Sequence, residues 1–311
     1  MLGVGIALGN GPSGNTYTIK QMIRSDTIEI TPEIHALIAR VDEFRRAWRA
    51  MGELAPEKRL PLRESAMVEA IGASMRIEGS PITDAQAEHV LQALSTDLSG
   101  SFSTSWEQEA AGYARLIETI FSSWRNIPFS ESSIKEMHGE LLGQSEKDAW
   151  HRGHYKAISS GSEDSVSDEV KAGLGARDVI PLETPRLMSE LMGWLKEEQS
   201  AKRLHSLLII ALWVVVFLKI HPFQEGNAPL SRMLTTLLLL QSGYSYVQYS
   251  SLESIIEQNK EAYDLALRQT QETIGTDSPN WQPWLVFFLR SLAQQVTRLE
   301  QKIERKTEPR D

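Results

Sequence analysis

Apolar residues recur every three or four positions along most of the chain, which is the spacing of an amphipathic α-helix. The clearest case is residues 30–51, where the apolar residues at helical spacing are Ile34, Leu37, Ile38, Val41, Phe44 and Trp48. The same spacing predicts further helices over residues 62–78, 83–94, 106–124, 130–143, 186–198, 204–220, 231–243, 252–273 and 281–305. Strands do not alternate with these helices and no unit repeats at a fixed period, so the pattern predicts a mainly α-helical protein.

Local signals mark where some of these helices begin and end. Gly79 and Pro81 follow the helix over 62–78, and a glycine followed by a proline is typical of a helix C-terminus. Thr83 and Gln86 form the pattern of an N-terminal capping box. The run over 207–218 is apolar on every side and too short to span a bilayer, so it predicts a helix buried within the protein core.

Two segments lack the helical period. Residues 150–185 are rich in Ser, Gly and Asp, and their β-compatible pieces at 155–159 and 178–182 predict a two-stranded hairpin. Residues 1–27 show no convincing period and are expected to form a loosely held tail. "GNGPSG" at 9–14 matches the glycine spacing of a dinucleotide-binding loop, but no strand–helix context surrounds it, which favours a flexible segment.

Composition narrows the functional classes. The net charge of −9 argues against nonspecific binding of nucleic acid through the overall electrostatic field of the protein. The absence of cysteine excludes disulfides, thiolate metal ligands and a thiol nucleophile, and it suits a reducing cytoplasm. The first residues lack a basic start before their apolar stretch, so no secretory signal is expected. Because the most apolar run, 207–218, is too short to span a bilayer, no membrane association is expected.

The stretch "HPFQEGNAPLSR", residues 221–232, joins the buried helix to the next one and carries the candidate chemistry. Asn227 is expected to be the N-cap of the second helix, whose first backbone N–H groups would then favour an anion. His221 could act as a general base, Glu225 could hold Mg²⁺ and Arg232 could bind a phosphate. Alternatively, His221 caps a helix end, Glu225 is solvated and Arg232 pairs with a surface carboxylate.

These residues resemble the motif of the Fic (Fic/Doc) family, H-x-F-x-[D/E]-G-N-G-R-x-x-R. Six positions match at the correct spacing: His221, Phe223, Glu225, Gly226, Asn227 and Arg232. "SMRIEG" at 74–79 resembles the family's inhibitory pattern [S/T]-x-x-x-E-[G/N], and "RGHYK" at 152–156 resembles the start of its substrate-docking flap. The resemblance extends over roughly residues 30–300.

The resemblance implies a Fic-type helical bundle with one β-hairpin flap. In that arrangement residues 1–27 are the tail and 28–110 form an N-terminal helical region with the inhibitory helix. Residues 111–280 form the Fic core with the flap at about 150–185, and 281–311 form a C-terminal helix.

The implied activity is transfer of AMP from Mg-ATP to a Ser, Thr or Tyr hydroxyl of a protein. His221 would deprotonate that hydroxyl, and Glu225 would hold Mg²⁺. The phosphate loop would comprise Gly226, Asn227 and Ala228, with Arg232 reaching the γ-phosphate.

Two further pairs of residues receive roles from the same resemblance. Tyr263 and Gln271 are candidates for the nucleoside pocket, although ordinary helix packing explains them as well. Ser74 and Glu78 lie four residues apart on one helix face. By family analogy Glu78 pairs with Arg232 and keeps the enzyme inhibited; as a plain alternative, it is a surface residue near a helix end.

Two positions depart from the family motif. Ala228 replaces a glycine where backbone approaches phosphate, and Pro229 replaces an arginine and removes a backbone N–H. Loss of one oriented donor from such a site typically costs roughly 3 to 4 kcal/mol of transition-state stabilisation. Two alternatives to AMP transfer therefore stay open: a Fic-fold pseudoenzyme that binds nucleotide or protein, or transfer of another phosphate-linked group.

The expected partner is a target protein that docks on the hairpin by adding a strand. Backbone pairing of this kind says little about the sequence of the target. The C-terminal helix could also supply a homo-oligomer interface, although packing back onto the core is an equal alternative.

Overall fold

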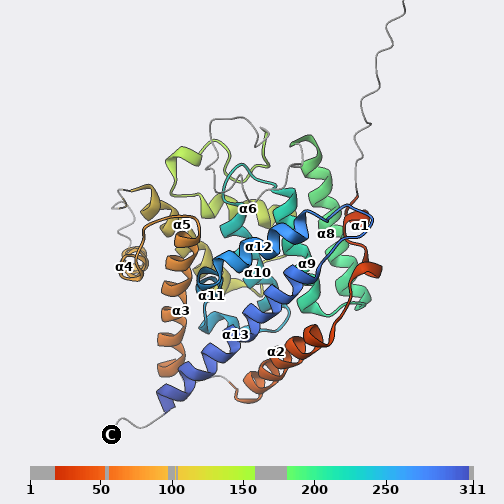
Figure 1. The fold of residues 1–311 in the computed structure, drawn as a ribbon. Coiled ribbons are helices and arrows are strands. Elements are labelled where there is room, and N and C mark those ends of the chain that lie inside the picture. The colour runs from red at the N-terminus through yellow and green to blue at the C-terminus, as the bar shows by residue number, and fades with distance from the viewer. Residues whose placement is uncertain (1–17, 53–55, 97–101, 103, 158–180, 308–311) are drawn as a thin grey trace, which may run out of the picture.

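The structure is a computed structural model, and it describes residues 18–52, 56–96, 102, 104–157 and 181–307. Helices make up the fold (Figure 1), and no strand occurs within these ranges. The α-helices are α1 Ile19–Met22, α2 Pro32–Ala50, α3 Pro56–Ile77, α4 Asp84–Ser95, α5 Ser105–Ser123, α6 Glu131–Leu141, α8 Thr184–Ala201, α9 Ser206–Ile220, α10 Asn227–Gln241, α11 Glu253–Gln258, α12 Lys260–Gln271 and α13 Gln282–Thr307. Short 3₁₀ helices occupy Ser25–Thr27, Glu146–Asp148, Pro181–Glu183 and Ser245–Tyr249.

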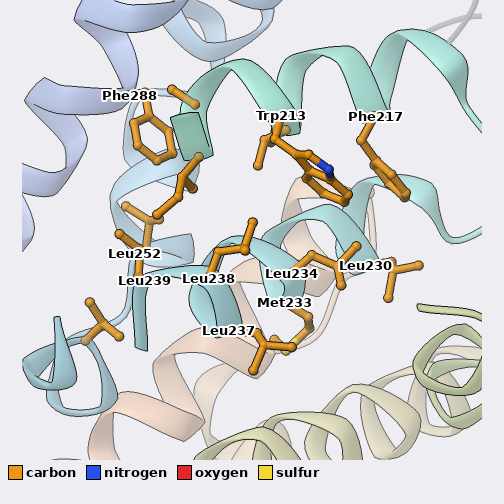
Figure 2. Packing of buried hydrophobic residues seen from close by; sticks show 14 of the residues in the cluster. Trp213, Phe217, Leu230, Met233, Leu234, Leu237, Leu238, Leu239, Leu252 and Phe288 are labelled. Atoms are coloured by element: carbon orange, nitrogen blue, oxygen red, sulfur yellow. The ribbon is translucent and has the colours of Figure 1, made fainter. Parts of the chain in front are cut away.

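Helix α9 is the centre of the core, as its apolar sequence predicts. Every residue from Leu207 to Leu218 is buried. The helices α8, α10, α12 and α13 pack against it, and Figure 2 shows Trp213 and Phe217 of α9 facing Leu230 and Leu234 of α10. No helix in the described ranges is both long and apolar enough to span a membrane. Because α9 and α10 pack closely in this core, the ends of both helices are held in place.

Helix α3 crosses one side of this core and packs against α4, α5 and α11. Its C-terminus has the expected form: Gly79 adopts a φ of 88°, and the Ser80 N–H donates to the Met75 carbonyl at 3.0 Å. Arg76 holds this end in place by donating to Glu257 of α11 at 2.5 Å and to Asp84 of α4 at 2.9 Å. The predicted capping box of Thr83 and Gln86 is confirmed.

The predicted loose tail is wrong for residues 18–27. Thr18 and Gln21 form a capping box around α1, and Ile19 and Met22 are buried. The Ile19 N–H also donates to the Glu190 carboxylate of α8 at 2.8 Å. Tertiary contacts with α8 order a segment too short to show a helical period. "GNGPSG" at 9–14 lies outside the described residues.

Two other predictions need correction. The single helix expected over 252–273 is two helices, because Asn259 leaves helical geometry with φ −121° and ψ 29° between α11 and α12. The described ends of the predicted hairpin, residues 155–157 and 181–182, are not strands, and Pro181–Glu183 is a 3₁₀ helix. Residues 158–180 lie outside the described ranges, so a hairpin there stays a prediction.

We predict that Gly112→Ala destabilises the fold by about 2 kcal/mol or more. A Cβ at this position of α5 would lie 1.9 Å from the Leu141 carbonyl oxygen of α6, and a backbone atom cannot move aside cheaply. Gly193→Ala on α8 is the matched control, because a Cβ there meets no atom within 4 Å. It should be neutral or stabilise by up to about 1 kcal/mol through helix propensity. Urea unfolding of both variants measures the difference, and equal stabilities would contradict the predicted close contact.

Candidate active site

His221 is the residue at which α9 ends. Its backbone N–H donates to the Phe217 carbonyl at 2.9 Å, and its φ of 50° lies in the left-handed region. Pro222 follows, and a proline sterically disfavours helical geometry in the residue before it. Few non-glycine residues adopt this conformation, and it persists only where the surroundings enforce it. The half-buried imidazole is therefore held at the end of a rigid core helix.

Asn227 closes the loop that follows His221. Its Oδ1 accepts the Phe223 N–H at 2.9 Å, and its Nδ2 donates to the Phe223 carbonyl at 2.8 Å. The same Nδ2 lies 3.4 Å from Nδ1 of His221. The prediction that Asn227 is the N-cap is wrong: Gly226 occupies that position with φ 77°, and Asn227 is the first helical residue. Its side chain satisfies the loop backbone instead of the helix N-terminus.

The start of α10 forms the candidate phosphate site. The first helical hydrogen bond joins the Leu230 N–H to the Gly226 carbonyl at 3.1 Å. The amides of Asn227 and Ala228 precede it, where N–H groups have no intrahelical acceptor and attract anions. Pro229 is buried in the same turn and contributes no N–H. Proline is tolerated here, so the helix start is intact but offers one donor fewer.

Glu225 is exposed on the same loop. Partial burial of its carboxyl, together with the nearby Asp148 carboxylate, raises the pKa of Glu225, and Lys147 opposes this shift. An accessible carboxylate among other acidic groups gains free energy when a cation binds. Glu225 is therefore suited to hold a divalent metal ion.

Arg232 is buried on α10 and binds the end of α3. Its Nη2 lies 2.8 Å from Oε1 of Glu78, and the exposed fractions of the two side chains are 3% and 36%. Its Nε and Nη2 also donate to the Ser74 hydroxyl at 3.1 and 2.8 Å. Burial opposes the charge of Arg232, but Glu78, Tyr113 and Tyr263 together outweigh this effect, and the pKa of Arg232 is raised. The structure thus brings Ser74, Glu78 and Arg232 together.

A second carboxylate, which is buried, lies behind this contact. Tyr113 of α5 donates to Glu253 of α11 at 3.0 Å, and both side chains are buried. Tyr113 also interacts with the Ser74 hydroxyl and with the charge of Arg232. Ser74 therefore links the guanidinium to a buried polar network. No local pattern in the sequence indicates Tyr113 or Glu253, because the contact joins residues 140 positions apart.

The two nucleoside-pocket candidates are placed differently. Tyr263 is buried against Trp284 and lines a pocket with Arg232, Ile256 and Phe287. Burial raises the pKa of Tyr263 to about 12, and the adjacent Arg232 opposes that shift. Gln271 is buried instead against α9, where it donates to the Val215 carbonyl at 3.4 Å. Gln271 does not line that pocket.

Two residues that the sequence did not single out hold the loop from its other side. His138 of α6 stacks on Phe223 with ring centres 3.9 Å apart, and it contacts the backbone of Glu225. Burial lowers the pKa of His138 to about 4. Lys156 donates its backbone N–H to the Pro222 carbonyl and its ammonium to the Ile220 carbonyl. In the sequence, His138 stands out only as a polar residue on the apolar face of the helix predicted over 130–143.

This loop, all of α9 and most of α10 lie within residues 128–239, which match the model of the Fic/DOC family. Residues 128–239 form a Fic/DOC family domain. The matched Fic domain runs from just before α6 into α10, so it contains His221, Glu225 and Arg232. Ser74, Glu78 and Tyr263 lie outside the matched residues.

Relatives and solved structures agree with this family. The chain is 28% identical over 240 residues to proteins named Protein adenylyltransferase Fic from Drosophila mojavensis and Drosophila virilis. The match covers 76% of this chain but only 44% and 45% of those proteins. A Fic family protein from Desulfovibrio desulfuricans superposes with a TM-score of 0.66 at 22% identity, over 92% of this chain and 78% of that one.

A Fic-domain-containing signalling protein from Bacteroides thetaiotaomicron superposes with a TM-score of 0.68 at 21% identity. That match covers 87% of this chain and 100% of the other. At such identities the structural similarity shows a shared fold. Together with the family match, it confirms the Fic-type helical bundle predicted from the sequence.

The low pKa of His138 predicts a specific loss of stability in acid. The folded protein favours the neutral ring, so stability is complete above the ordinary pKa of 6.5 and is lost as the pH falls toward about 4. The difference corresponds to roughly 3 kcal/mol. Urea unfolding between pH 7 and 4 should show this extra loss in the unmodified protein and not in His138→Gln. Parallel pH profiles would contradict a buried neutral His138.

Proposed function

We propose that this protein transfers AMP from ATP to a hydroxyl group of a target protein. The proposal rests on one observation above all: a single loop of a Fic domain carries a candidate base, a candidate metal carboxylate and a helix N-terminus. His221, Glu225 and Asn227 supply these groups within seven residues. The printed name of the Drosophila relatives supports the same activity.

In the proposed reaction, an imidazole nitrogen of His221 accepts the proton of the target hydroxyl. The hydroxyl oxygen then forms a bond to the α-phosphorus of ATP. The bond between that phosphorus and the oxygen bridging to the β-phosphate breaks, and pyrophosphate leaves. The amides of Asn227 and Ala228 would bind phosphate oxygens, and Arg232 would bind the terminal phosphate.

Glu225 fits the requirements of Mg²⁺. Mg²⁺ in nucleotide sites is commonly held by one or two carboxylates together with phosphate oxygens, and it retains several waters. Glu225 offers an accessible carboxylate on the phosphate loop, and Asp148 adds negative charge nearby. When bound, Mg²⁺ neutralises charge on the phosphates and orients them. Glu225 would hold it beside the N-terminus of α10.

We also propose that the α3 end inhibits the enzyme. Glu78 occupies Arg232 with a carboxylate, so the γ-phosphate must displace it or bind in another orientation. Glu78 is 36% exposed and Arg232 is 3% exposed, so the partner that can leave is the acid. Because α3 belongs to the same chain, the inhibition would be intramolecular.

The target would dock on the hairpin predicted at about 150–185 by adding a strand to it. In the described part of that segment, Lys156 bonds to the carbonyls of Pro222 and Ile220. This contact supports docking close to the loop that follows His221.

A second candidate function is binding of nucleotide or protein without transfer. It is favoured by Pro229, which is buried in the first turn of α10 and removes one amide from the phosphate site. A third is transfer of another phosphate-linked group, which the same base and loop would support. The mass added to a modified protein separates AMP from other groups.

The test compares three proteins incubated with labelled ATP, Mg²⁺ and a cell lysate: the unmodified chain, Glu78→Gly, and Glu78→Gly with Ala228→Gly and Pro229→Arg. We expect faint labelling by the first and at least tenfold more by the second. The third should exceed the second by on the order of 10²-fold or more, since it regains an oriented donor and a charge.

Intact-mass spectrometry should find one AMP added to labelled proteins. His221→Ala in the triple-substituted background is the control and should abolish labelling. No transfer by any of these proteins, together with measurable Mg-ATP binding in calorimetry, would contradict the enzyme and support the binding module.

A further inference from the structure

His138 touches three different parts of the active-site region, although it belongs to none of the motifs. It lies on α6 and is completely buried. Its Nε2 is 3.1 Å from the Glu225 carbonyl, its Nδ1 is 2.9 Å from the Gly153 amide, and its ring stacks on Phe223 at an interplanar angle of 9°.

The hydrogen bonds fix where the ring proton lies. The Gly153 N–H can only donate, so Nδ1 of His138 is the acceptor and carries no hydrogen. The neutral ring therefore carries its hydrogen on Nε2, which donates to the Glu225 carbonyl. Both ring nitrogens therefore form hydrogen bonds: Nδ1 can only accept, and Nε2 can only donate.

The bond to Glu225 acts at the point where the loop turns into α10. The Glu225 carbonyl belongs to the peptide unit shared with Gly226, whose φ is 77°. Rotation of this peptide would redirect both the Glu225 side chain and the first amides of α10. The Phe223 ring, two residues earlier, is fixed by the stacking contact. His138 therefore holds the loop on both sides of Gln224.

The bond to Gly153 joins the same ring to another segment. Gly153 has a φ of 72° and precedes the predicted docking hairpin. Three residues later, Lys156 bonds to the carbonyls of Pro222 and Ile220, at the other end of the loop. The segment 153–156 is thus attached to the loop at two places, and His138 is one of them.

We infer that His138 is a positioning residue that holds Glu225 for the divalent cation and couples this loop to the base of the docking segment. This inference rests on the proposed function. Packing alone would not require the residue, since a phenylalanine could stack on Phe223 equally well. The two hydrogen bonds require an imidazole with one donor and one acceptor.

Three substitutions separate these contributions. His138→Gln can place an amide nitrogen near the position of Nε2 and keep the bond to Glu225. His138→Asn can place an oxygen near the position of Nδ1 and keep the bond to Gly153. His138→Phe keeps only the ring stacking. Each is made in the Glu78→Gly, Ala228→Gly, Pro229→Arg background, in which transfer is expected to be fastest.

We expect the Mg²⁺ concentration for half-maximal transfer to rise about tenfold or more in His138→Asn and His138→Phe, as is typical when a group supporting a metal ligand is lost. In His138→Gln it should rise by less than about threefold. The KM for ATP at saturating Mg²⁺ should change little in any of them. This split distinguishes positioning of the metal ligand from general damage to the site.

His205 supplies the matched control at the opposite end of α9. Its Nδ1 accepts the Leu207 N–H at 3.3 Å, and its Nε2 lies 3.1 Å from Asp42, so it also bridges two groups. His205→Asn and His205→Gln should leave the Mg²⁺ dependence of the background protein unchanged. Urea unfolding of every variant checks that the fold is retained.

Calorimetry provides a readout without turnover. ATP is titrated into each protein in Mg²⁺ and in EDTA, and the ratio of the two affinities should fall in His138→Asn and His138→Phe but not in His138→Gln. Equal ratios for all four proteins, or equal losses in all three variants, would overturn the inference. If the background protein binds ATP without transferring AMP, the proposed function fails and this ratio still decides the role of His138. If it binds no ATP, both fail.

Discussion

A buried guanidinium constrains the arrangement of this protein more than any other single group. Arg232 is 3% exposed, and an isolated charge at such a depth would cost several kcal/mol. Within the described ranges, Ser74 and Glu78 at the end of α3 bind its Nε and Nη2 atoms, and Glu78 balances its charge. Helix α3 must therefore end beside α10, and Arg76 secures that position through Glu257 and Asp84.

The loop before α10 is controlled by a different set of contacts. Helix α9 is buried along its length and sets the position of His221. Within the loop, the side chain of Asn227 bonds to the backbone N–H and carbonyl of Phe223. His138 and Lys156 attach the loop to α6 and to the segment before residue 158. Rigid helices thus supply the groups of the proposed chemistry, and the short loop is restrained from both sides. Such restraint is what precise placement of a base and a metal ligand requires.

The sequence predicts correctly those features that depend on residues close together in the chain. The end of α3 at Gly79, the capping box at Thr83 and the burial of α9 each follow from neighbouring residues, and all are confirmed. The N-cap of α10 was misassigned because the side chain of Asn227 bonds to the backbone of Phe223, four residues earlier. The remaining failures come from distant contacts: helix α1, for example, is held against α8 by a contact across 171 positions.

The supporting residues of the site were missed for the same reason. His138 contacts Glu225 across 87 positions, and no local pattern reveals such a pair. The proximity of Ser74, Glu78 and Arg232 could be expected only through the family resemblance.

In the proposed inhibition, Glu78 and the terminal phosphate of ATP compete for Arg232. Calorimetric titration of Mg-ATP and Mg-ADP into the unmodified protein and Glu78→Gly is the sharpest test, because ADP lacks the γ-phosphate. We predict that Glu78→Gly strengthens ATP binding about tenfold or more and changes ADP binding by less than about threefold, a difference of about 0.7 kcal/mol or more. Equal gains for ATP and ADP, or no gain for ATP, would contradict it.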